Sequence, residues 1–170
     1  MGTQGRIEWH PHEAFVPTRV RCLVVGSFPG RDMTLSPGPE DWFYGTRRNQ
    51  FWQIMELAYQ RKLDSKNARQ ALCEEAGIAF ADIIRSCVRT AGNNLDENLE
   101  IIEWNDDVIT PVLESWQPLV LFTSRFVEKL FRQKFPYYTN TDVLPSPSPR
   151  YFRLRVEDKA AIYKEKLPPV

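Results

Sequence analysis

The sequence predicts a three-layer α/β/α sandwich around a central parallel sheet of about four strands. Short apolar runs alternate with segments whose apolar residues recur at helical spacing, which is typical of parallel strands joined by helices. The length of 170 residues fits one domain, and 42% hydrophobic with 26% charged residues is ordinary for a globular protein. We therefore expect residues 1–170 to form a single domain, with an N-terminal extension at 1–18 and a core at 19–167.

The first half of the chain predicts two strands and two helices. Residues 21–25 (RCLVV) form a nearly continuous apolar run, which is typical of a buried parallel strand. Apolar residues at helical spacing predict a helix at 50–59 and a second one at 66–76, where Gly77 offers a C-terminal stop. The run AFADII predicts the next strand at 79–84.

The second half begins with a further helix, strand and helix. Asn105 is a candidate cap for a helix that ends near residue 115. The run LVLF predicts a strand at 119–122, after which Thr123 or Ser124 caps a helix. The apolar residues that face inward from this helix are Phe126, Val127, Leu130 and Phe131.

A short strand near 141–144 and a C-terminal helix at about 154–166 complete the predicted fold. Ligands of open parallel sheets bind beyond the carboxyl ends of the strands. The segments that follow predicted strand ends are therefore candidate parts of a site, and they are Gly26–Gly30, Asp82–Thr90, Thr123–Ser124 and Leu144–Arg150.

The charges balance overall but are unevenly distributed. The 22 Lys and Arg residues match 22 Asp and Glu residues, which excludes a uniformly basic nucleic-acid-binding protein. Between Thr90 and Ser124 there are seven acidic residues and no Lys or Arg, so the rest of the chain has a net charge of +7. The cations include 15 Arg, whose planar guanidinium suits phosphate. We expect one acidic face and one basic face.

Several classes of protein are excluded by what the sequence lacks. No apolar run approaches the roughly 18 residues of a membrane span, and the N-terminus has no signal-peptide core. Cys22, Cys73 and Cys87 are too few for a disulfide framework or an iron–sulfur cluster. His10 and His12 are an isolated pair and a poor metal site, and no mid-chain histidine can act as a base. We expect a cytoplasmic protein, nucleoid-associated if bacterial, with no metal or cofactor.

The turn Gly26–Gly30 (GSFPG) follows the first predicted strand. Its two glycines and its proline preset a tight turn in which backbone N–H groups can approach a ligand. No G-x-G-x-x-G or G-K-[ST] pattern occurs there, which excludes a dinucleotide or phosphate loop. Taken alone, the segment is more typical of an ordinary turn.

The loop Tyr44–Trp52 (YGTRRNQFW) places Arg47 and Arg48 between an aromatic residue, which we expect to be exposed, and the start of a helix. This pattern combines base stacking with attraction to phosphate. Spacing alone favours Asn49 as the N-cap of the helix. The two aromatic residues that end the loop are expected in the core.

The loop Leu144–Arg150 (LPSPSPR) alternates proline with serine. It predicts a stiff extended segment that presents the hydroxyls of Ser146 and Ser148, followed by Arg150 and Arg153. Hydroxyl and guanidinium groups of this kind bind phosphate. The alternative is a rigid connector to the last helix.

Four motifs, in this order, resemble the uracil-DNA glycosylase superfamily: GSFPG, YGTRRNQFW, GIAFADIIRSCVRTAGNNLD and LPSPSPR. The resemblance covers Val20 to about Tyr151 and is closest to the branch of DNA-deoxyinosine (hypoxanthine-DNA) glycosylases. It implies a monomer that hydrolyses the N-glycosidic bond of a deaminated base, hypoxanthine or uracil, in DNA. Such enzymes flip the nucleotide out of the stack into a pocket and need no metal or cofactor.

The resemblance also implies roles for individual residues. Asn49 would hold the attacking water or polarise the breaking bond, and Asp82 is the second candidate, as a base or charge stabiliser. For Asp82 a capping or structural role is equally favoured. The implied base pocket consists of Gly26, Ser27, Phe28, Pro29, Gly30, Tyr44, Thr123 and Ser124. The implied DNA-binding residues are Arg47, Arg48, Ser146, Ser148, Arg150 and Arg153.

Some positions depart from the best-known members of the superfamily. Phe28 stands where other branches carry a water-activating Asp or Asn, and a phenyl ring can stack on a base but cannot orient water. Gly30 replaces a bulky Tyr of uracil-specific members and leaves room for a purine. Thr123 and Ser124 replace an Asn-Gly pair, and Ser replaces His in the late loop.

Two other functions stay open. A weakly active or inactive relative would bind lesion-containing or single-stranded nucleic acid through the same pocket. An enzyme acting on free nucleosides is also possible on this fold, because fold does not determine function.

Overall fold

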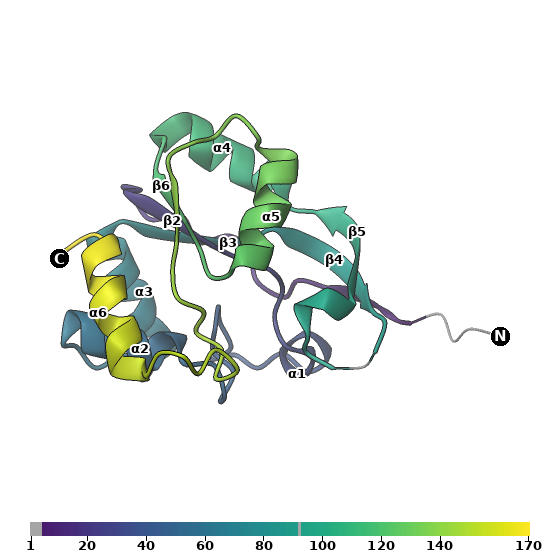
Figure 1. Cartoon of the computed structure of the whole chain (residues 1–170), viewed down its shortest axis with the longest axis horizontal. Helices are drawn as coiled ribbons and strands as arrows, with labels where there is room; N and C mark the ends of the chain where they lie inside the picture. The colour runs from purple at the N-terminus through teal and green to yellow at the C-terminus, as the bar shows by residue number, and fades with distance from the viewer. Residues whose placement is uncertain (1–4, 92) are drawn as a thin grey trace.

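A computed structural model describes residues 5–91 and 93–170, which form two β-sheets flanked by helices (Figure 1). The strands are β1 (Ile7–Trp9), β2 (Cys22–Gly26), β3 (Ile78–Asp82), β4 (Ile84–Arg89), β5 (Leu99–Trp104), β6 (Leu119–Phe122) and β7 (Thr141–Val143). The helices are α1 (Arg31–Leu35), α2 (Phe51–Tyr59), α3 (Lys66–Ala76), the 3-10 turn η1 (Asp96–Asn98), α4 (Asp106–Trp116), α5 (Arg125–Lys134) and α6 (Val156–Lys166). Within these ranges, no helix is long and apolar enough to cross a membrane.

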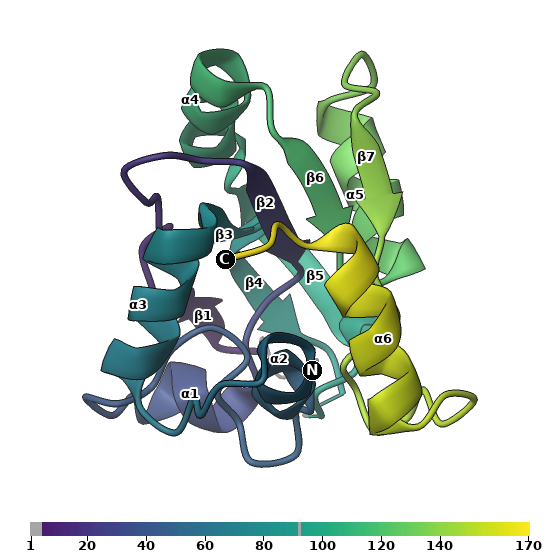
Figure 2. The same ribbon diagram turned by 90° about the vertical axis from the view of Figure 1, so that its left-hand side faces the viewer.

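The larger sheet is parallel, has the strand order β3-β2-β6-β7, and forms the middle layer of the molecule. Helices α2, α3 and α6 cover one face, and α4 and α5 cover the other (Figures 1 and 2). Successive strand side chains point to opposite faces. In β2, Cys22 and Val24 therefore join the core under α2, whereas Leu23 and Val25 join the core under α4 and α5. The predicted α/β/α sandwich is confirmed.

Helix α3 has the bounds that the sequence predicts, because both of its ends carry local signals. The Ser65 hydroxyl accepts a hydrogen bond from Ala68 N at 3.1 Å. Gly77 ends the helix in the left-handed conformation, with φ of 75°. A Cβ atom at Gly77 would lie 2.9 Å from the carbonyl oxygen of Arg19, so glycine is required there.

The predicted strand at 79–84 is wrong in its second half. Strand β3 ends at Asp82 and β4 begins at Ile84, so the chain leaves the parallel sheet between them. Ile83 N donates a hydrogen bond to Gly26 O at 2.9 Å, which closes this turn. The apolar pattern continues through the turn because Ile83 and Ile84 are both fully buried, so it gives no sign of the break.

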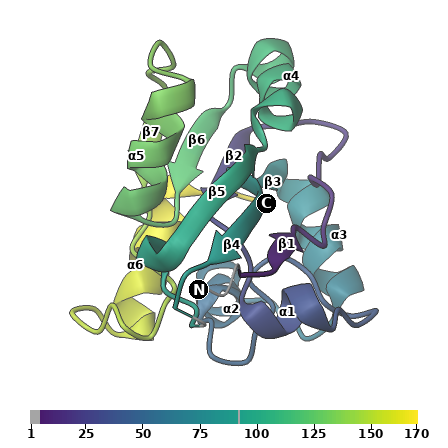
Figure 3. The same ribbon diagram turned by 90° about the vertical axis from the view of Figure 1, so that its right-hand side faces the viewer.

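A second, antiparallel sheet has the order β1-β4-β5, and the sequence pattern did not predict it (Figure 3). Strand β1 pairs with β4, and Phe15 forms a further bridge with Phe80 of the parallel sheet. Residues 7–15 are thus part of the folded unit, although the sequence predicts an extension from the core at 1–18. Residues 1–4 of that extension lie outside the described residues.

Candidate active site

The carboxyl ends of the parallel strands meet at one edge of the sheet, at the lower end of the strands in Figure 2. The register pairs Gly26 with Asp82 and Val25 with Phe122, so the loops that follow β2, β3 and β6 begin side by side. The segments that the sequence predicts to meet are therefore brought to a common edge.

The loops around Asn49 and after β7 are joined directly. Gln50 N donates a hydrogen bond to Pro147 O at 2.8 Å. The fully buried Lys159 of α6 donates to Gln50 Oε1 at 2.8 Å and to Ser148 O at 3.2 Å. One ammonium group thus holds two of the predicted loops together.

The predicted N-cap role of Asn49 is wrong, because Gln50 is the N-cap of α2 and Asn49 precedes it by one residue. Its Oδ1 accepts a hydrogen bond from Phe51 N at 2.9 Å, and its own N–H donates to Thr46 O at 3.1 Å. Within residues 5–91 and 93–170, no hydrogen-bond partner is seen for the Nδ2 group of this half-buried side chain. Asn49 can therefore bind the first N–H group of α2 with its oxygen and still present an N–H donor.

Tyr44 differs from the expectation of an exposed aromatic residue. Its ring stacks on Phe51, with the centroids 4.4 Å apart, and its hydroxyl is buried. Burial, with a smaller contribution from Asp82, raises the pKa of the Tyr44 hydroxyl well above its usual value. Phe51 and Trp52 are buried, as predicted.

Asp82 is buried beside a histidine that sequence reasoning did not connect with it. Its Oδ2 accepts a hydrogen bond from His10 Nε2 at 2.7 Å, and both side chains are at least nine-tenths buried. His10 Nδ1 accepts from His12 N at 3.1 Å, so in the neutral ring Nε2 carries the proton. The Asp82 carbonyl accepts from Asn105 Nδ2 at 2.9 Å, so the Asn105 side chain does not cap α4.

Gly26 leaves the space in which two buried polar atoms converge. Asp82 Oδ1 and Tyr44 Oη are both buried and have no hydrogen-bond partner among the described residues. A Cβ atom at Gly26 would lie 2.7 Å from Asp82 Oδ1 and even closer to Tyr44 Oη. Glycine is therefore required at the end of β2, because any side chain would collide with both groups.

Phe28 is half-buried and held in place by two neighbours. The ring of His10 meets it edge-on, with the centroids 5.7 Å apart. The Arg89 guanidinium lies over the ring at 5.7 Å and also donates to Pro29 O at 2.6 Å. Arg89 is itself paired with Glu8 at 2.9 Å, and both side chains are buried. Phe28 therefore presents a fixed aromatic surface in the turn that follows β2.

The connection between β4 and β5 forms a further wall that the sequence did not predict. Ser27 Oγ donates a hydrogen bond to Asp96 Oδ1 at 2.6 Å, and Arg31 N donates to Asn94 Oδ1 at 2.9 Å. Burial raises the pKa of the Asp96 carboxyl above its usual value. The available signal is the end of the third motif, GNNLD, whose Asp96 the sequence analysis counts among the acidic residues but does not assign to the site.

The two residues after β6 differ in their roles. Thr123 is buried, and its N–H donates to Val25 O at 3.1 Å. Ser124 Oγ accepts a hydrogen bond from Val127 N at 3.2 Å, which makes Ser124 the cap of α5. Of the two predicted capping residues, the structure uses Ser124.

The predicted DNA-binding arginines are exposed, and within the described ranges none of them has an ion-pair partner. They are Arg47, Arg48, Arg150 and Arg153. Phe152, between the last two, is 86% exposed. Ser146 Oγ accepts from Ser148 N and Ser148 Oγ accepts from Arg150 N, both at 3.2 Å. The two serine hydroxyls therefore stabilise the loop that presents Arg150.

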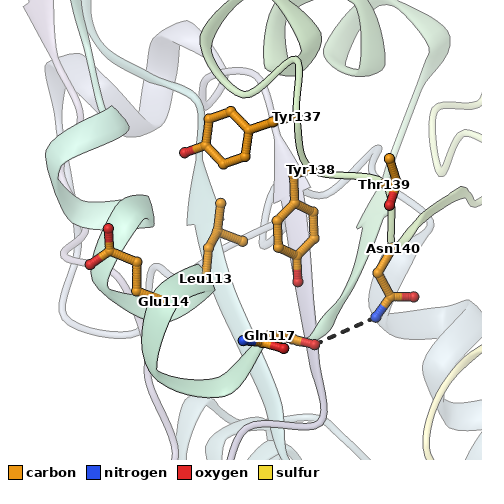
Figure 4. Close-up of a pocket in the computed structure, with 7 residues that line it drawn as sticks. All are labelled: Leu113, Glu114, Gln117, Tyr137, Tyr138, Thr139 and Asn140. Carbon is orange, nitrogen blue, oxygen red and sulfur yellow. Dashed lines mark hydrogen bonds between the residues drawn. The ribbon is translucent and has the colours of Figure 1, made fainter.

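Of two hollows in the described surface, one lies away from these loops and the other adjoins the turn Gly26–Gly30 through Arg31 and Arg89. One, of about 400 Å³, is at the amino edge of the parallel sheet between α4 and the segment before β7 (Figure 4). The other, of about 230 Å³, is lined by residues that include Glu8, Arg31 and Arg89. Among the described residues, no group of three His, Cys, Asp or Glu side chains could hold a metal ion.

Comparison with known proteins identifies a shared fold. No protein-family model matches the sequence, and no curated protein matches it. Among solved structures, the chain is similar to the solution NMR structure of a protein from Methanosarcina acetivorans that is named "putative Uracil DNA glycosylase". The TM-score is 0.71 and the sequence identity is 20%, over 94% of this chain and 98% of that one. The chain therefore has the fold of that protein.

Proposed function

We propose that this chain is a monofunctional DNA glycosylase that hydrolyses the N-glycosidic bond of hypoxanthine or uracil in DNA and acts as a monomer. The observation that carries the proposal is the meeting of the predicted loops at one edge of the sheet. This edge carries a fixed aromatic surface, Phe28, an amide donor, Asn49, and four exposed arginines that have no ion-pair partner among the described residues. The fold shared with a protein named as a uracil DNA glycosylase supports it further.

DNA would be bound by the exposed arginines and opened by an aromatic side chain. Arg47, Arg48, Arg150 and Arg153 would neutralise phosphates next to the lesion. Phe152 is exposed between two of them, which suits a side chain that inserts into the base stack when a nucleotide is flipped. Flipping costs a few kcal/mol, least for a mismatched base.

The absence of a side chain at Gly30 supports a purine substrate. A Cβ atom there would lie 3.5 Å from Thr46 Cγ2 and 3.7 Å from Asn94 Nδ2, at ordinary contact distances. These contacts leave no open space at the Cβ position itself, so only the absence of a side chain at Gly30 favours a larger base. A flipped hypoxanthine could then stack on Phe28.

In the reaction, the bond between C1′ and the base breaks, and its electron pair leaves with the base. The sugar develops oxocarbenium character, and a water oxygen forms the new bond to C1′ while the water proton is transferred away. We assign Asn49 Nδ2 to hold this water or the leaving base. Asp82, whose Oδ1 is buried and whose Oδ2 is bound by His10, fits a supporting role beneath the pocket.

The experiment that tests the function uses the purified full chain on labelled duplex and single-stranded DNA containing hypoxanthine, uracil or xanthine. Abasic sites are then revealed by alkaline cleavage. We expect cleavage of the hypoxanthine or uracil strand at enzyme excess. No abasic product on any substrate would refute the proposal, and equal rates on free deoxyinosine would indicate a nucleoside enzyme instead.

A second candidate function is binding of lesion-containing or single-stranded nucleic acid without catalysis. Phe28, which cannot activate water, and the engagement of Ser124 as a helix cap favour it. It predicts salt-sensitive binding to abasic DNA with no turnover. The substrate screen, run alongside a binding titration, separates the two candidates.

A further inference from the structure

The connection between β4 and β5 is bound to the turn after β2 at three points. Ser27 Oγ donates to Asp96 Oδ1, Arg31 N donates to Asn94 Oδ1, and Arg89 donates to both Pro29 O and Asn93 O. The segment 93–98 is therefore a fixed wall next to Phe28, although it comes from the other sheet.

Within this wall, one carboxylate oxygen of Asp96 accepts a hydrogen bond and the other does not. Its Oδ1 accepts the Ser27 hydrogen bond at 2.6 Å. In the described part of the chain, Oδ2 has no hydrogen-bond partner, and it is not one of the buried polar atoms without partners. Oδ2 therefore has some surface that solvent can reach.

In Asp82, the carboxylate that the sequence predicts as a catalytic candidate, neither oxygen is open. Its Oδ2 is bound by His10, and its Oδ1 is buried against Gly26 and Tyr44. A carboxylate can accept a proton from water only through an oxygen that the water reaches. Of the two, Asp96 meets this requirement.

We propose that Asp96 is the catalytic carboxylate of this site and that Ser27 is its positioning residue. This inference rests on the proposed glycosylase function. Asp96 Oδ2 accepts a proton from the attacking water as the water oxygen bonds to C1′, and the base departs with the electron pair of the broken C1′–N bond. The negative charge also stabilises the oxocarbenium character of the sugar. The proton then passes to solvent or to the departed base, which restores the carboxylate.

The surroundings of Asp96 make it a stronger base than an ordinary carboxylate. Burial raises the pKa of Asp96, and the nearby carboxylates of Asp82 and Glu97 act in the same direction. The Ser27 hydrogen bond and the charge of Arg89 act in the opposite direction. Because the deprotonated form is the active one, the rate should fall as the pH drops through this raised pKa.

The test compares single-turnover rates of wild type, Asp96→Asn, Ser27→Ala and the control Glu100→Gln on the strand that the substrate screen identifies. Glu100 is an exposed acid in the same acidic stretch, on β5. We expect Asp96→Asn to be slower by roughly 100-fold or more, and Glu100→Gln to match wild type. Ser27→Ala should be slowed less and should move the acid limb of the pH–rate profile to higher pH, because a hydrogen bond to the carboxylate is lost.

A second measurement uses the wild type alone, in case Asp96→Asn does not fold. Wild type should bind DNA with a cationic pyrrolidine in place of the abasic sugar more tightly than DNA with neutral tetrahydrofuran, and lose this preference as Asp96 is protonated. If the wild type is active but Asp96→Asn cleaves at the same rate, the role of Asp96 is overturned and the proposed function is not. The same holds if the active wild type shows no preference for the cationic pyrrolidine. A wild type inactive on every substrate would overturn the proposed function and this role with it.

Discussion

The two edges of the parallel sheet differ in what their polar groups do. At the amino edge, the hollow of about 400 Å³ is lined by Leu113, Glu114, Gln117, Tyr137, Tyr138, Thr139 and Asn140 (Figure 4). The Tyr138 hydroxyl donates to Pro118 O, and Asn140 Nδ2 donates to Gln117 O at 3.5 Å. These two side chains therefore stabilise the turns to which they belong.

At the carboxyl edge, charged and polar groups are available to a ligand. Four arginines lack ion-pair partners within the described ranges, and Asn49 Nδ2 and Asp96 Oδ2 have no hydrogen-bond partner there. The volume of a surface hollow therefore does not identify the candidate site in this molecule. The open end of a parallel sheet, with groups not engaged in the fold, is the better criterion.

After Asp96, the largest effect on the comparison of the two edges is expected at Asn49. Asn49→Asp keeps the oxygen that accepts from Phe51 N but removes the N–H donor, so it should slow single-turnover cleavage at least roughly tenfold, about 1.4 kcal/mol of barrier, with little loss of stability. Asn49→Ala should also cost about 1 kcal/mol of unfolding free energy, because the hydrogen bond from Phe51 N is lost. Rates and chemical denaturation measure the two effects separately.

The matched control is Asn140→Ala, which removes an amide at the amino edge. It should leave the cleavage rate unchanged. A wild-type rate in Asn49→Asp would limit Asn49 to its structural role of accepting the hydrogen bond from Phe51 N.

The next effect concerns the exposed arginines. The double variant Arg47→Ala/Arg48→Ala should weaken DNA binding uniformly across sequences, because both side chains would contact phosphate. The slope of log K against log salt should become shallower by about 2. Titrations at several salt concentrations measure it, with Arg61→Ala as control, since Arg61 pairs with Glu75. An unchanged slope in the double variant would move the DNA contact to another face.

A third effect is the acid sensitivity of the carboxyl edge. Burial, aided by the nearby His10, lowers the pKa of His12 from 6.5 to about 4. Between these values the unfolded chain binds the proton and the folded protein does not, so the free energy of unfolding should decrease as the pH falls from 6.5 to 4. Denaturation at pH 7 and pH 5 should show a smaller decrease in His12→Gln than in wild type. The same pH dependence in both proteins would contradict this role.

The smallest effect is expected at the amino edge. Tyr137 is 71% exposed, so Tyr137→Ala should change the unfolding free energy by no more than about 0.5 kcal/mol. Cleavage and DNA binding should equal those of wild type. A lower rate in this variant would show that the hollow takes part in the function, and the contrast between the two edges would fail.

Elements with their own local signals were predictable from the sequence. Strand β6 has the predicted bounds because an apolar run lies between Pro118 and a helix cap. Helix α3 has the predicted bounds because Ser65 and Gly77 stop it at both ends. The fold class and the edge that gathers the loops follow from the alternation of such elements.

Pairings between distant segments were not predictable. His10 and Asp82 are 72 residues apart, and Ser27 and Asp96 are 69 apart. Neither pair has a periodicity or a spacing that would indicate contact. Both result from the antiparallel sheet, which brings β1 and the β4–β5 connection against the turn after β2.

The sequence by itself determined the layered α/β/α architecture, the order of its main elements and the loops that carry the candidate site. Local hydrophobic patterns and capping residues act over a few positions, so they can be read along the chain. The tertiary structure alone decided which carboxylate is buried and which one is open, that Tyr44 packs inward, and that four arginines of the carboxyl edge have no ion-pair partner within the described ranges. These properties depend on burial and on contacts across the chain, which exist only once both sheets have formed.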